Sequence, residues 1–225
     1  GMLNINRDLE FLKPNDMSLS RVVVIDRQGG FVRAMGDFEY MDMGLEFSDP
    51  VAVSKGGNDD ILVSDPLNGR IVRYSNSGVF ISQFYYNNPE SELPSVIETD
   101  ADGNIYVLKV FMDQSQSVID VYSSSGTFMG IIGNNAGLSV CLGMAITPYM
   151  IFVTDFGNNN VKVLDTQGNL LGVFNALGSE HGRLSGPAGI MADNDGVIYI
   201  TESNAQRVRM FDADGNYLGI FEEGL

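Results

Sequence analysis

A segment that recurs five times constrains the fold of this chain more than any other feature of the sequence. Each copy alternates apolar and polar residues and then reaches a polar turn that ends in glycine. This pattern indicates a half-buried strand that enters a hairpin. The turn glycines follow one another at intervals of roughly 42 to 49 residues. The five copies are residues 21–29, 70–78, 118–126, 160–168 and 207–215.

Each copy is part of a larger unit of strands. A second short strand follows every turn, and four of the five units carry two further strands upstream. The first strand of these four units is made of small and apolar residues, such as Ala52, Gly143 and Gly189, which suit an innermost strand close to a common axis. Four strands in about 45 residues, repeated along the chain, is the spacing of propeller blades. No segment sustains the 3.6-residue apolar period of a helix, so helices should be scarce.

The sequence therefore predicts an all-β, single-domain β-propeller over residues 1–225. It should have four complete four-stranded antiparallel blades and one incomplete N-terminal blade, five in total. The alternative is an open fragment of a six-bladed ring. Residues 1–20 match the repeat poorly; Leu9 to Leu12 is a candidate strand of the incomplete blade, for which no innermost strand is evident. The predicted blades are about 21–36 (partial), 47–84, 93–133, 141–174 and 187–221.

The repeat units resemble those of a known family. Residues 195–218 closely resemble an NHL repeat, as do residues 151–171, and the resemblance extends from Arg21 to Phe221. It implies a propeller of radially arranged four-stranded blades, usually about six in members of the family. Some NHL-like propellers are lyases or lactonases, and the resemblance implies that such enzymes need several His or acidic residues around the central channel, often with a metal.

Composition excludes several classes of function. The chain has 29 acidic and 13 basic residues and a net charge of −16, which argues against a nucleic-acid partner and an anionic membrane surface. No apolar run approaches the length of a membrane span, so we expect no membrane insertion. One cysteine, Cys141, and one histidine, His181, rule out an internal disulfide and a His-rich metal site. Because Gly1-Met2 looks like a remnant of expression, we expect that a leader was removed and that the protein works in a bacterial periplasm or at the cell surface.

An acid ends the second strand of three units, and in two of them a base follows it five residues later. These pairs are Asp65/Arg70 and Glu202/Arg207. A catalytic group should be special to one unit, whereas this pattern repeats. We therefore interpret both as structural pairs within a blade that fix the loop between the second and third strands.

A ligand should meet the face built by the connections between blades and by the loops between second and third strands. We call it the loop face. Its loops combine aromatic and amide side chains, which suit a sugar, a peptide or a protein surface. The lone histidine of the chain also lies in one of these connections. The predicted ligand-binding residues are Phe38, Tyr40, Tyr85, Tyr86, Asn87, Asn88, Phe156, Asn158, His181 and Arg183.

Three hypotheses of function follow. The leading one is a non-enzymatic binding or scaffold propeller that recognises a protein, peptide or glycan, with no catalytic residues, no cofactor and no metal. The second is a metal-assisted lyase, lactonase or other hydrolase, in which carboxylates near the central channel hold Ca²⁺. The third is self-association through the incomplete blade, because an uncovered strand edge is normally paired or protected.

Overall fold

Five antiparallel sheets follow one another along the chain in the computed structural model, and each is formed by consecutive strands. Helix within the described part of the chain is limited to two 3₁₀ turns, Gly57–Asp59 and Pro66–Asn68. The predicted all-β propeller of four-stranded blades is confirmed. The structure describes the backbone of residues 2–6, and residues 20–36, 46–87, 92–113, 115–174 and 183–221.

The first sheet has three strands and each of the other four sheets has four, within the described ranges. In every four-stranded sheet the strands pair in chain order, so that each strand contacts the one before and the one after it. The strands are β1 Met2–Asn6, β2 Arg21–Ile25 and β3 Phe31–Met35; β4 Ala52–Lys55, β5 Ile61–Asp65, β6 Arg70–Tyr74 and β7 Phe80–Tyr85; β8 Glu92–Thr99, β9 Ile105–Phe111, β10 Ser117–Tyr122 and β11 Phe128–Ile132; β12 Cys141–Ile146, β13 Ile151–Asp155, β14 Asn160–Leu164 and β15 Leu170–Phe174; β16 Pro187–Ala192, β17 Ile198–Glu202, β18 Arg207–Phe211 and β19 Tyr217–Ile220.

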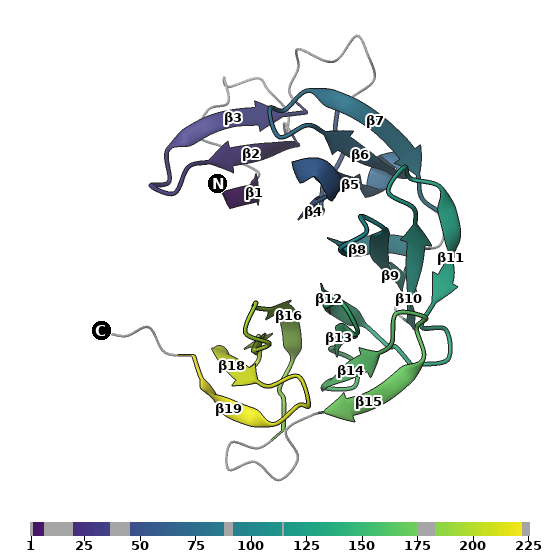
Figure 1. Ribbon diagram of the computed structural model, residues 1–225, viewed down its shortest axis with the longest axis vertical. Helices are drawn as coiled ribbons and strands as arrows, with labels where there is room; N and C mark the ends of the chain where they lie inside the picture. The colour runs from purple at the N-terminus through teal and green to yellow at the C-terminus, as the bar shows by residue number, and fades with distance from the viewer. Residues whose placement is uncertain are drawn as a thin grey trace.

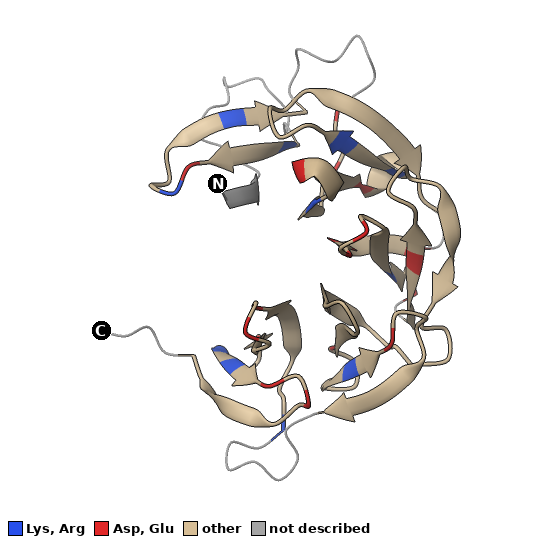
Figure 2. Cartoon of the chain, viewed as in Figure 1, with Lys and Arg blue, Asp and Glu red and all other residues tan. Residues whose placement is uncertain are grey.

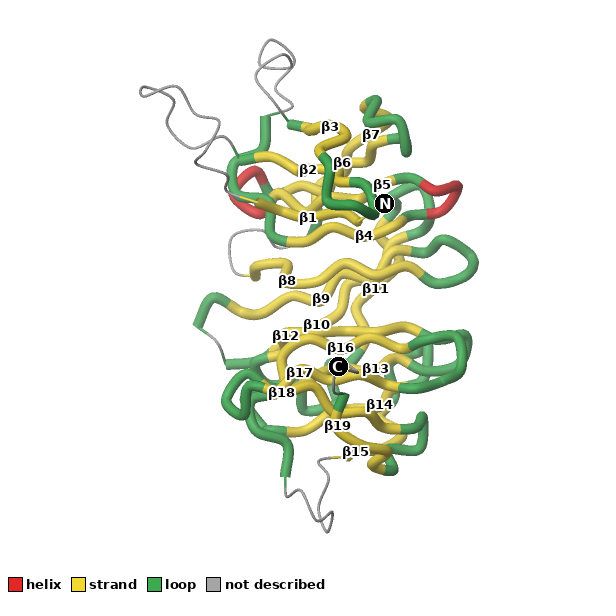
Figure 3. The backbone as a smooth tube through the Cα atoms, turned by 90° about the vertical axis from the view of Figure 1, so that its left-hand side faces the viewer, coloured by secondary structure: helices red, strands yellow, loops and turns green. Residues whose placement is uncertain are grey.

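The sheets are arranged as the blades of an open arc (Figure 1). The innermost strands β4, β8, β12 and β16 line the inside of the arc, and the outermost strands lie on its outer rim. The first sheet (β1–β3) and the last sheet (β16–β19) lie at the two ends of the arc, on either side of its open side. Seen from that side, the strands form the middle of the molecule and the loops form two opposite faces (Figure 3).

The apolar core is divided among the joints between neighbouring sheets. Side chains on the two faces of each strand alternate, so one face packs against the preceding sheet and the other against the following one. Four clusters of buried side chains result, one for each joint of five sheets. Their members include Val22, Val63 and Tyr74 at the first joint, Leu62, Ile97 and Tyr122 at the second, Leu108, Ile119 and Val153 at the third, and Phe152, Ile200 and Phe211 at the fourth.

The first sheet corrects one detail of the sequence analysis. Its extra strand is β1, which pairs with β2 so that Asn6 lies opposite Arg21. In the second sheet the same register places Asp65 opposite Arg70, so β1 occupies the place of a second strand. The segment from Leu9 to Leu12 lies outside the described residues. The described first sheet therefore lacks only an innermost strand.

None of the described residues belongs to a helix that is long and apolar enough to cross a membrane.

Candidate functional site

The acid that ends the second strand has the same task in three of the sheets. Its carboxylate accepts the main-chain N–H of a serine that lies just ahead of the innermost strand of the same sheet. The carboxylate thereby fixes the point where the chain enters the innermost strand. The donor–acceptor pairs are Ser48 with Asp65 at 2.8 Å, Ser139 with Asp155 at 3.3 Å and Ser185 with Glu202 at 2.7 Å.

The predicted acid–base pairs are in direct contact. Arg70 Nε lies 2.9 Å from Asp65 Oδ2, and Arg207 Nε lies 2.6 Å from Glu202 Oε2. A second arginine that the sequence analysis did not single out, Arg209, also binds Glu202, with Nε at 2.6 Å, and its side chain is fully buried. Burial raises the pKa of Glu202, but the hydrogen bonds from Arg209 and Arg207 outweigh burial and lower it. These carboxylates are engaged in holding the fold.

In the third sheet, a positively charged residue stands where the other sheets have this acid. Lys109 takes the place of the acid, is completely buried and contacts both Glu92 and Asp120, the latter at 2.8 Å. Its ammonium also donates to the main-chain oxygen of Asn87 at 2.8 Å. Tyr122 donates to Asp120 at 2.9 Å. Burial raises the pKa of Asp120 in spite of the hydrogen bond from Lys109.

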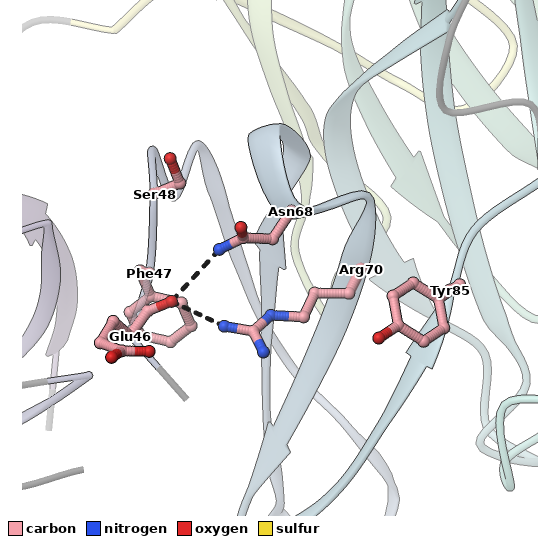
Figure 4. Close-up of a pocket in the computed structure, with 6 residues that line it drawn as sticks. All are labelled: Glu46, Phe47, Ser48, Asn68, Arg70 and Tyr85. Carbon is pink, nitrogen blue, oxygen red and sulfur yellow. Dashed lines mark hydrogen bonds between the residues drawn. The ribbon is translucent and has the colours of Figure 1, made fainter. Parts of the chain in front are cut away.

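A polar hollow of about 500 Å³ opens on the loop face beside the second sheet (Figure 4). The main-chain oxygen of Glu46 forms one wall, where it accepts hydrogen bonds from Asn68 Nδ2 at 3.2 Å and from Arg70 Nη2 at 2.7 Å. Tyr85 lies on the far side of Arg70 and is 68% exposed. The lining residues are Glu46, Phe47, Ser48, Asn68, Arg70 and Tyr85.

The predicted ligand-binding residues that the structure describes lie apart from one another rather than in one site. Tyr85 lines the loop-face hollow, whereas the neighbouring Tyr86 is buried and donates to the main-chain oxygen of Pro66 at 2.8 Å. Burial, together with the charge of Asp65, raises the pKa of Tyr86 to about 12. The main-chain oxygen of Asn87 accepts a hydrogen bond from Lys109. Lys109, Glu92 and Asp120 together form what we call the Lys109 cluster.

The other predicted residues are dispersed in the same way. Asn158 donates to Asp155 Oδ2 at 2.7 Å and so supports the end of its own sheet. Phe156, the residue that follows this acid, is partly buried. The main-chain oxygen of Arg183 accepts a hydrogen bond from Arg209 at 2.9 Å. Four of the predicted residues lie outside the described residues: Phe38, Tyr40, Asn88 and His181.

A second hollow, of about 470 Å³, lies on the opposite face between the third and fourth sheets. Asp100, Tyr106 and Thr147 are among the residues that line it. The Tyr106 hydroxyl donates to Asp100 Oδ2 at 3.3 Å. Burial and the charge of Asp100 raise the pKa of Tyr106 to about 12, so the phenol stays protonated.

The sequence analysis missed one carboxyl group, which lies across a strand pair from Tyr106. Glu98 lies on the innermost strand β8, directly opposite Tyr106 in the β8–β9 pair. Its carboxylate makes no hydrogen bond or ion pair with any described residue, and partial burial raises its pKa to about 7. An acid within the otherwise apolar and hydroxyl-bearing run 95–99 was the available signal.

The described residues do not fit a metal centre. No group of three or more His, Cys, Asp or Glu side chains within them is arranged to hold a metal ion. The Asp-Gly loops that superficially resemble calcium loops are hairpin turns, in which Asp100 Oδ1 accepts the N–H groups of Asp102 and Asn104. Cys141 is buried, which raises its pKa to about 12 and makes it a poor nucleophile.

Comparison with solved structures identifies the class of fold. The chain superposes on virginiamycin B lyase from Staphylococcus aureus with a TM-score of 0.63 at 16% identity, over 91% of this chain and 64% of the lyase. It superposes on a gluconolactonase from Xanthomonas campestris with a TM-score of 0.66 at 15% identity, over 91% of this chain and 69% of the other. A calcium-binding regucalcin from Agrobacterium tumefaciens gives a TM-score of 0.61 at 13% identity, over 90% of this chain and 66% of the other.

These matches establish a β-propeller fold of the type found in lyases and gluconolactonases. The chain spans less than two thirds of the length of the lyase. No family model and no curated protein matches the sequence.

The enzymes among these structures contradict our leading hypothesis of a non-enzymatic scaffold. The expectation that leaned away from an enzyme rested on the absence of a second histidine, and the same structures contradict it. The comparisons favour the alternative of a lyase or lactonase.

Proposed function

We propose that this chain is part of a lyase or lactone hydrolase in which Glu98 acts as the general acid–base. The observation that carries this proposal is the contrast between Glu98, which is partly buried, and the fully buried acids. Glu92, Asp120 and Glu202 each contact a buried cation. Glu98 has no partner among the described residues, and its pKa is raised to about 7.

Such a group suits both reactions. In a lyase, the carboxylate removes a proton from the carbon next to the one that bears the leaving oxygen. The C–O bond then breaks as a C=C bond forms, and the protonated carboxyl group gives its proton to the leaving oxygen. In a lactonase, the carboxylate takes a proton from water, which attacks the carbonyl carbon; the ring C–O bond breaks and the ring oxygen takes up the proton from the carboxyl group. A base with a pKa near the working pH serves either step best. The hollow beside Tyr106 offers a polar space for a small substrate.

The family of the repeats is also a proposal. The resemblance of residues 151–171 and 195–218 to NHL repeats supports it. A calcium requirement is not part of the proposed mechanism, because the described residues do not fit a metal centre.

The test is an activity assay on two substrate classes. Hydrolysis of glucono-1,5-lactone and loss of intact quinupristin are measured from pH 5 to 9, with EDTA and with added Ca²⁺. Quinupristin is chosen because a catalytically inactive virginiamycin B lyase was solved with it. We expect acceleration of at least one reaction, with a rate that rises through pH 7. Glu98→Gln should lower kcat by roughly 10² to 10⁴ and remove that rise.

The matched control is Asp214→Asn, which neutralises an acid of the exposed outer turn that ends the β18 segment. It should leave the rate unchanged. No acceleration with either substrate, or full activity in Glu98→Gln, would overturn the assignment.

The pH dependence of stability tests the environment of Glu98 without any substrate. Its pKa is about 7 in the folded protein against an ordinary value of 4.5. The folded state therefore binds a proton more readily, and this group lowers the free energy of unfolding as the pH rises from about 4.5 through 7. Glu98→Gln should melt close to the wild type at pH 4.5 and be more stable by about 2 kcal/mol at pH 8. An equal difference at both pH values would show that Glu98 is well solvated.

A further inference from the structure

The loop-face hollow beside the second sheet presents polar groups that the fold itself does not use. Both side-chain N–H groups of Asn68 donate, one to the main-chain oxygen of Glu46 and one to Asp65 Oδ2 at 2.8 Å, so its Oδ1 atom remains an acceptor. The Glu46 carboxylate and the hydroxyl groups of Ser48 and Tyr85 have no hydrogen-bond or ionic partner among the described residues. The lining of the hollow can therefore still bind a ligand through these groups.

The walls that carry these groups are fixed by the surrounding structure. The Ser48 N–H donates to Asp65 Oδ1 at 2.8 Å, and the Ser48 main-chain oxygen accepts the Ser20 hydroxyl at 2.8 Å. Phe47 is buried, and the Arg70 side chain, which binds the main chain of this segment, is only 6% exposed. Because these walls are already ordered, a ligand would bind there at a low cost in conformational entropy.

Tyr85 gives the hollow an aromatic wall. It is the last residue of β7 and lies opposite Arg70 in the β6–β7 pair. Its side chain is largely exposed, and its hydroxyl group points toward the other lining residues (Figure 4). An exposed ring with a polar tip suits a ligand that has both an apolar surface and hydroxyl groups.

The balance of donors and acceptors restricts the kind of ligand. The Arg70 guanidinium is already engaged, because it donates to Asp65 at 2.9 Å and to Gln83 Oε1 at 2.9 Å. It also donates to the main-chain oxygen of Glu46. The described lining thus offers more acceptors than donors. A peptide backbone has as many carbonyl groups as N–H groups and would leave carbonyl groups without partners here, whereas every hydroxyl group of a ligand can donate.

The charges around the hollow disfavour a charged ligand. Acidic and basic residues both occur along the second sheet (Figure 2). The Glu46 carboxylate would repel an anion, whereas the Arg70 guanidinium, which lies between Glu46 and Tyr85, would repel a cation (Figure 4). A neutral ligand that is rich in hydroxyl groups satisfies both restrictions.

We propose that the loop-face hollow binds a saccharide. The C–H face of a sugar ring packs on Tyr85, and its hydroxyl groups donate to the Glu46 carboxylate and to Asn68 Oδ1. The volume of about 500 Å³ lies within the range of small-molecule sites. This site is separate from the proposed reaction, because Glu98 lies two residues before Asp100, which lines the hollow on the opposite face.

The test measures the binding of methyl glycosides of glucose, galactose, mannose and N-acetylglucosamine by saturation-transfer difference NMR and calorimetry. We expect at least one of them to bind, with the strongest saturation on the C–H protons of one face of the sugar. Tyr85→Ala removes the aromatic wall and should weaken binding roughly tenfold. Glu46→Gln should also weaken it roughly tenfold, because hydrogen bonds to a charged acceptor are the stronger kind.

Both variants should fold, which thermal melting checks. Tyr85 is exposed, and Glu46→Gln keeps the main-chain oxygen that Asn68 and Arg70 bind.

Three control variants should leave the affinity for the glycoside unchanged. Tyr149→Ala is the control for the aromatic ring, because Tyr149 is 81% exposed in the turn between β12 and β13. Asp214→Asn is the control for the loss of an exposed acid. Glu98→Gln separates this site from the proposed reaction.

Three results would overturn the proposal. One is the absence of binding by all of the glycosides at ~10 mM. The second is binding that Tyr85→Ala and Glu46→Gln both leave unchanged, or that Glu98→Gln abolishes. The third is a preference for N-acetylarginine amide over every glycoside, which would show a site for a cation.

Discussion

In the third and last sheets, buried ion pairs hold the second strand to its neighbours, but the second strand carries opposite charges in the two sheets. In the last sheet, one acid at the end of the second strand, Glu202, binds two arginines of the third strand. In the third sheet, one base at that place, Lys109, binds Glu92 of the innermost strand and Asp120 of the third strand. The comparison shows that a buried ion pair between the strands of one sheet can form with either charge on the second strand.

In the same two sheets, a hydroxyl group links the innermost strand to the second strand, but a different strand carries it in each sheet. In the last sheet, Thr201 of the second strand accepts the N–H of Gly189 at 2.7 Å. In the third sheet, Ser95 of the innermost strand donates to the main-chain oxygen of Leu108 at 3.2 Å. In both sheets, a hydrogen bond of this hydroxyl group joins the innermost strand to the second strand. The two sheets therefore share a hydroxyl link between these strands, although the hydroxyl group comes from different strands.

The largest effect should come from Lys109→Met. This change leaves two buried carboxyl groups without their cation, and breaking a buried pair in this way costs about 3–5 kcal/mol. The free energy of unfolding, measured with urea, should fall by about 4 kcal/mol at pH 7. The loss should grow with pH, because burial already raises the pKa of Asp120 and the folded variant tolerates its two acids only when they are protonated.

Lys55→Met is the matched control for this change. Lys55 pairs with Asp59 at the surface, where the two side chains are 72% and 63% exposed. Exposed pairs contribute roughly 0–1 kcal/mol, so the free energy of unfolding should hardly change. Similar losses for both lysines would show that the Lys109 cluster is accessible to solvent.

Glu202→Gln should have the next largest effect, with the opposite dependence on pH. It leaves the fully buried Arg209 without a countercharge, so we expect a loss of about 3 kcal/mol at pH 7. The pKa of Glu202 is lowered in the folded protein, and its stabilisation is therefore present above the ordinary pKa of a glutamate and lost as the pH falls through the lowered value. The difference between wild type and variant should be constant from pH 5 to 8 and shrink below pH 4. A difference that grows between pH 5 and 8 would contradict this account.

The repeat predicted the sheets well, because the alternation that buries one face of a strand is visible in the sequence. It predicted the pairs Asp65/Arg70 and Glu202/Arg207 as neighbours because acid and base stand directly opposite in antiparallel strands. It did not reveal the Lys109 cluster. Two of its members come from other strands, and four additional residues between Lys109 and Val118 conceal the correspondence.

Two other features depend on burial and pairing that sequence patterns do not carry. The strand β1 was missed because a connection of 14 residues separates it from β2, longer than in the other sheets. The raised pKa of Glu98 arises from its partial burial on β8, and its place in the run 95–99 hints at burial without showing that the carboxylate lacks a partner.

The smallest losses of stability should come from removing the hydroxyl groups of Thr201 and Ser95. Their sizes test whether the last and third sheets depend equally on these hydroxyl groups. Thr201→Val keeps the shape of the side chain but leaves the N–H of Gly189 without its acceptor, which should cost about 1 kcal/mol. Ser95→Ala removes a longer hydrogen bond to a carbonyl group and should cost about 0.5 kcal/mol. Both are measured by urea unfolding at a concentration where light scattering gives the monomer. If Ser95→Ala is the more costly change, the third sheet depends on the Ser95 hydroxyl to hold its innermost strand. The ion pairs of Lys109 would then not be sufficient to hold that strand without the hydroxyl group.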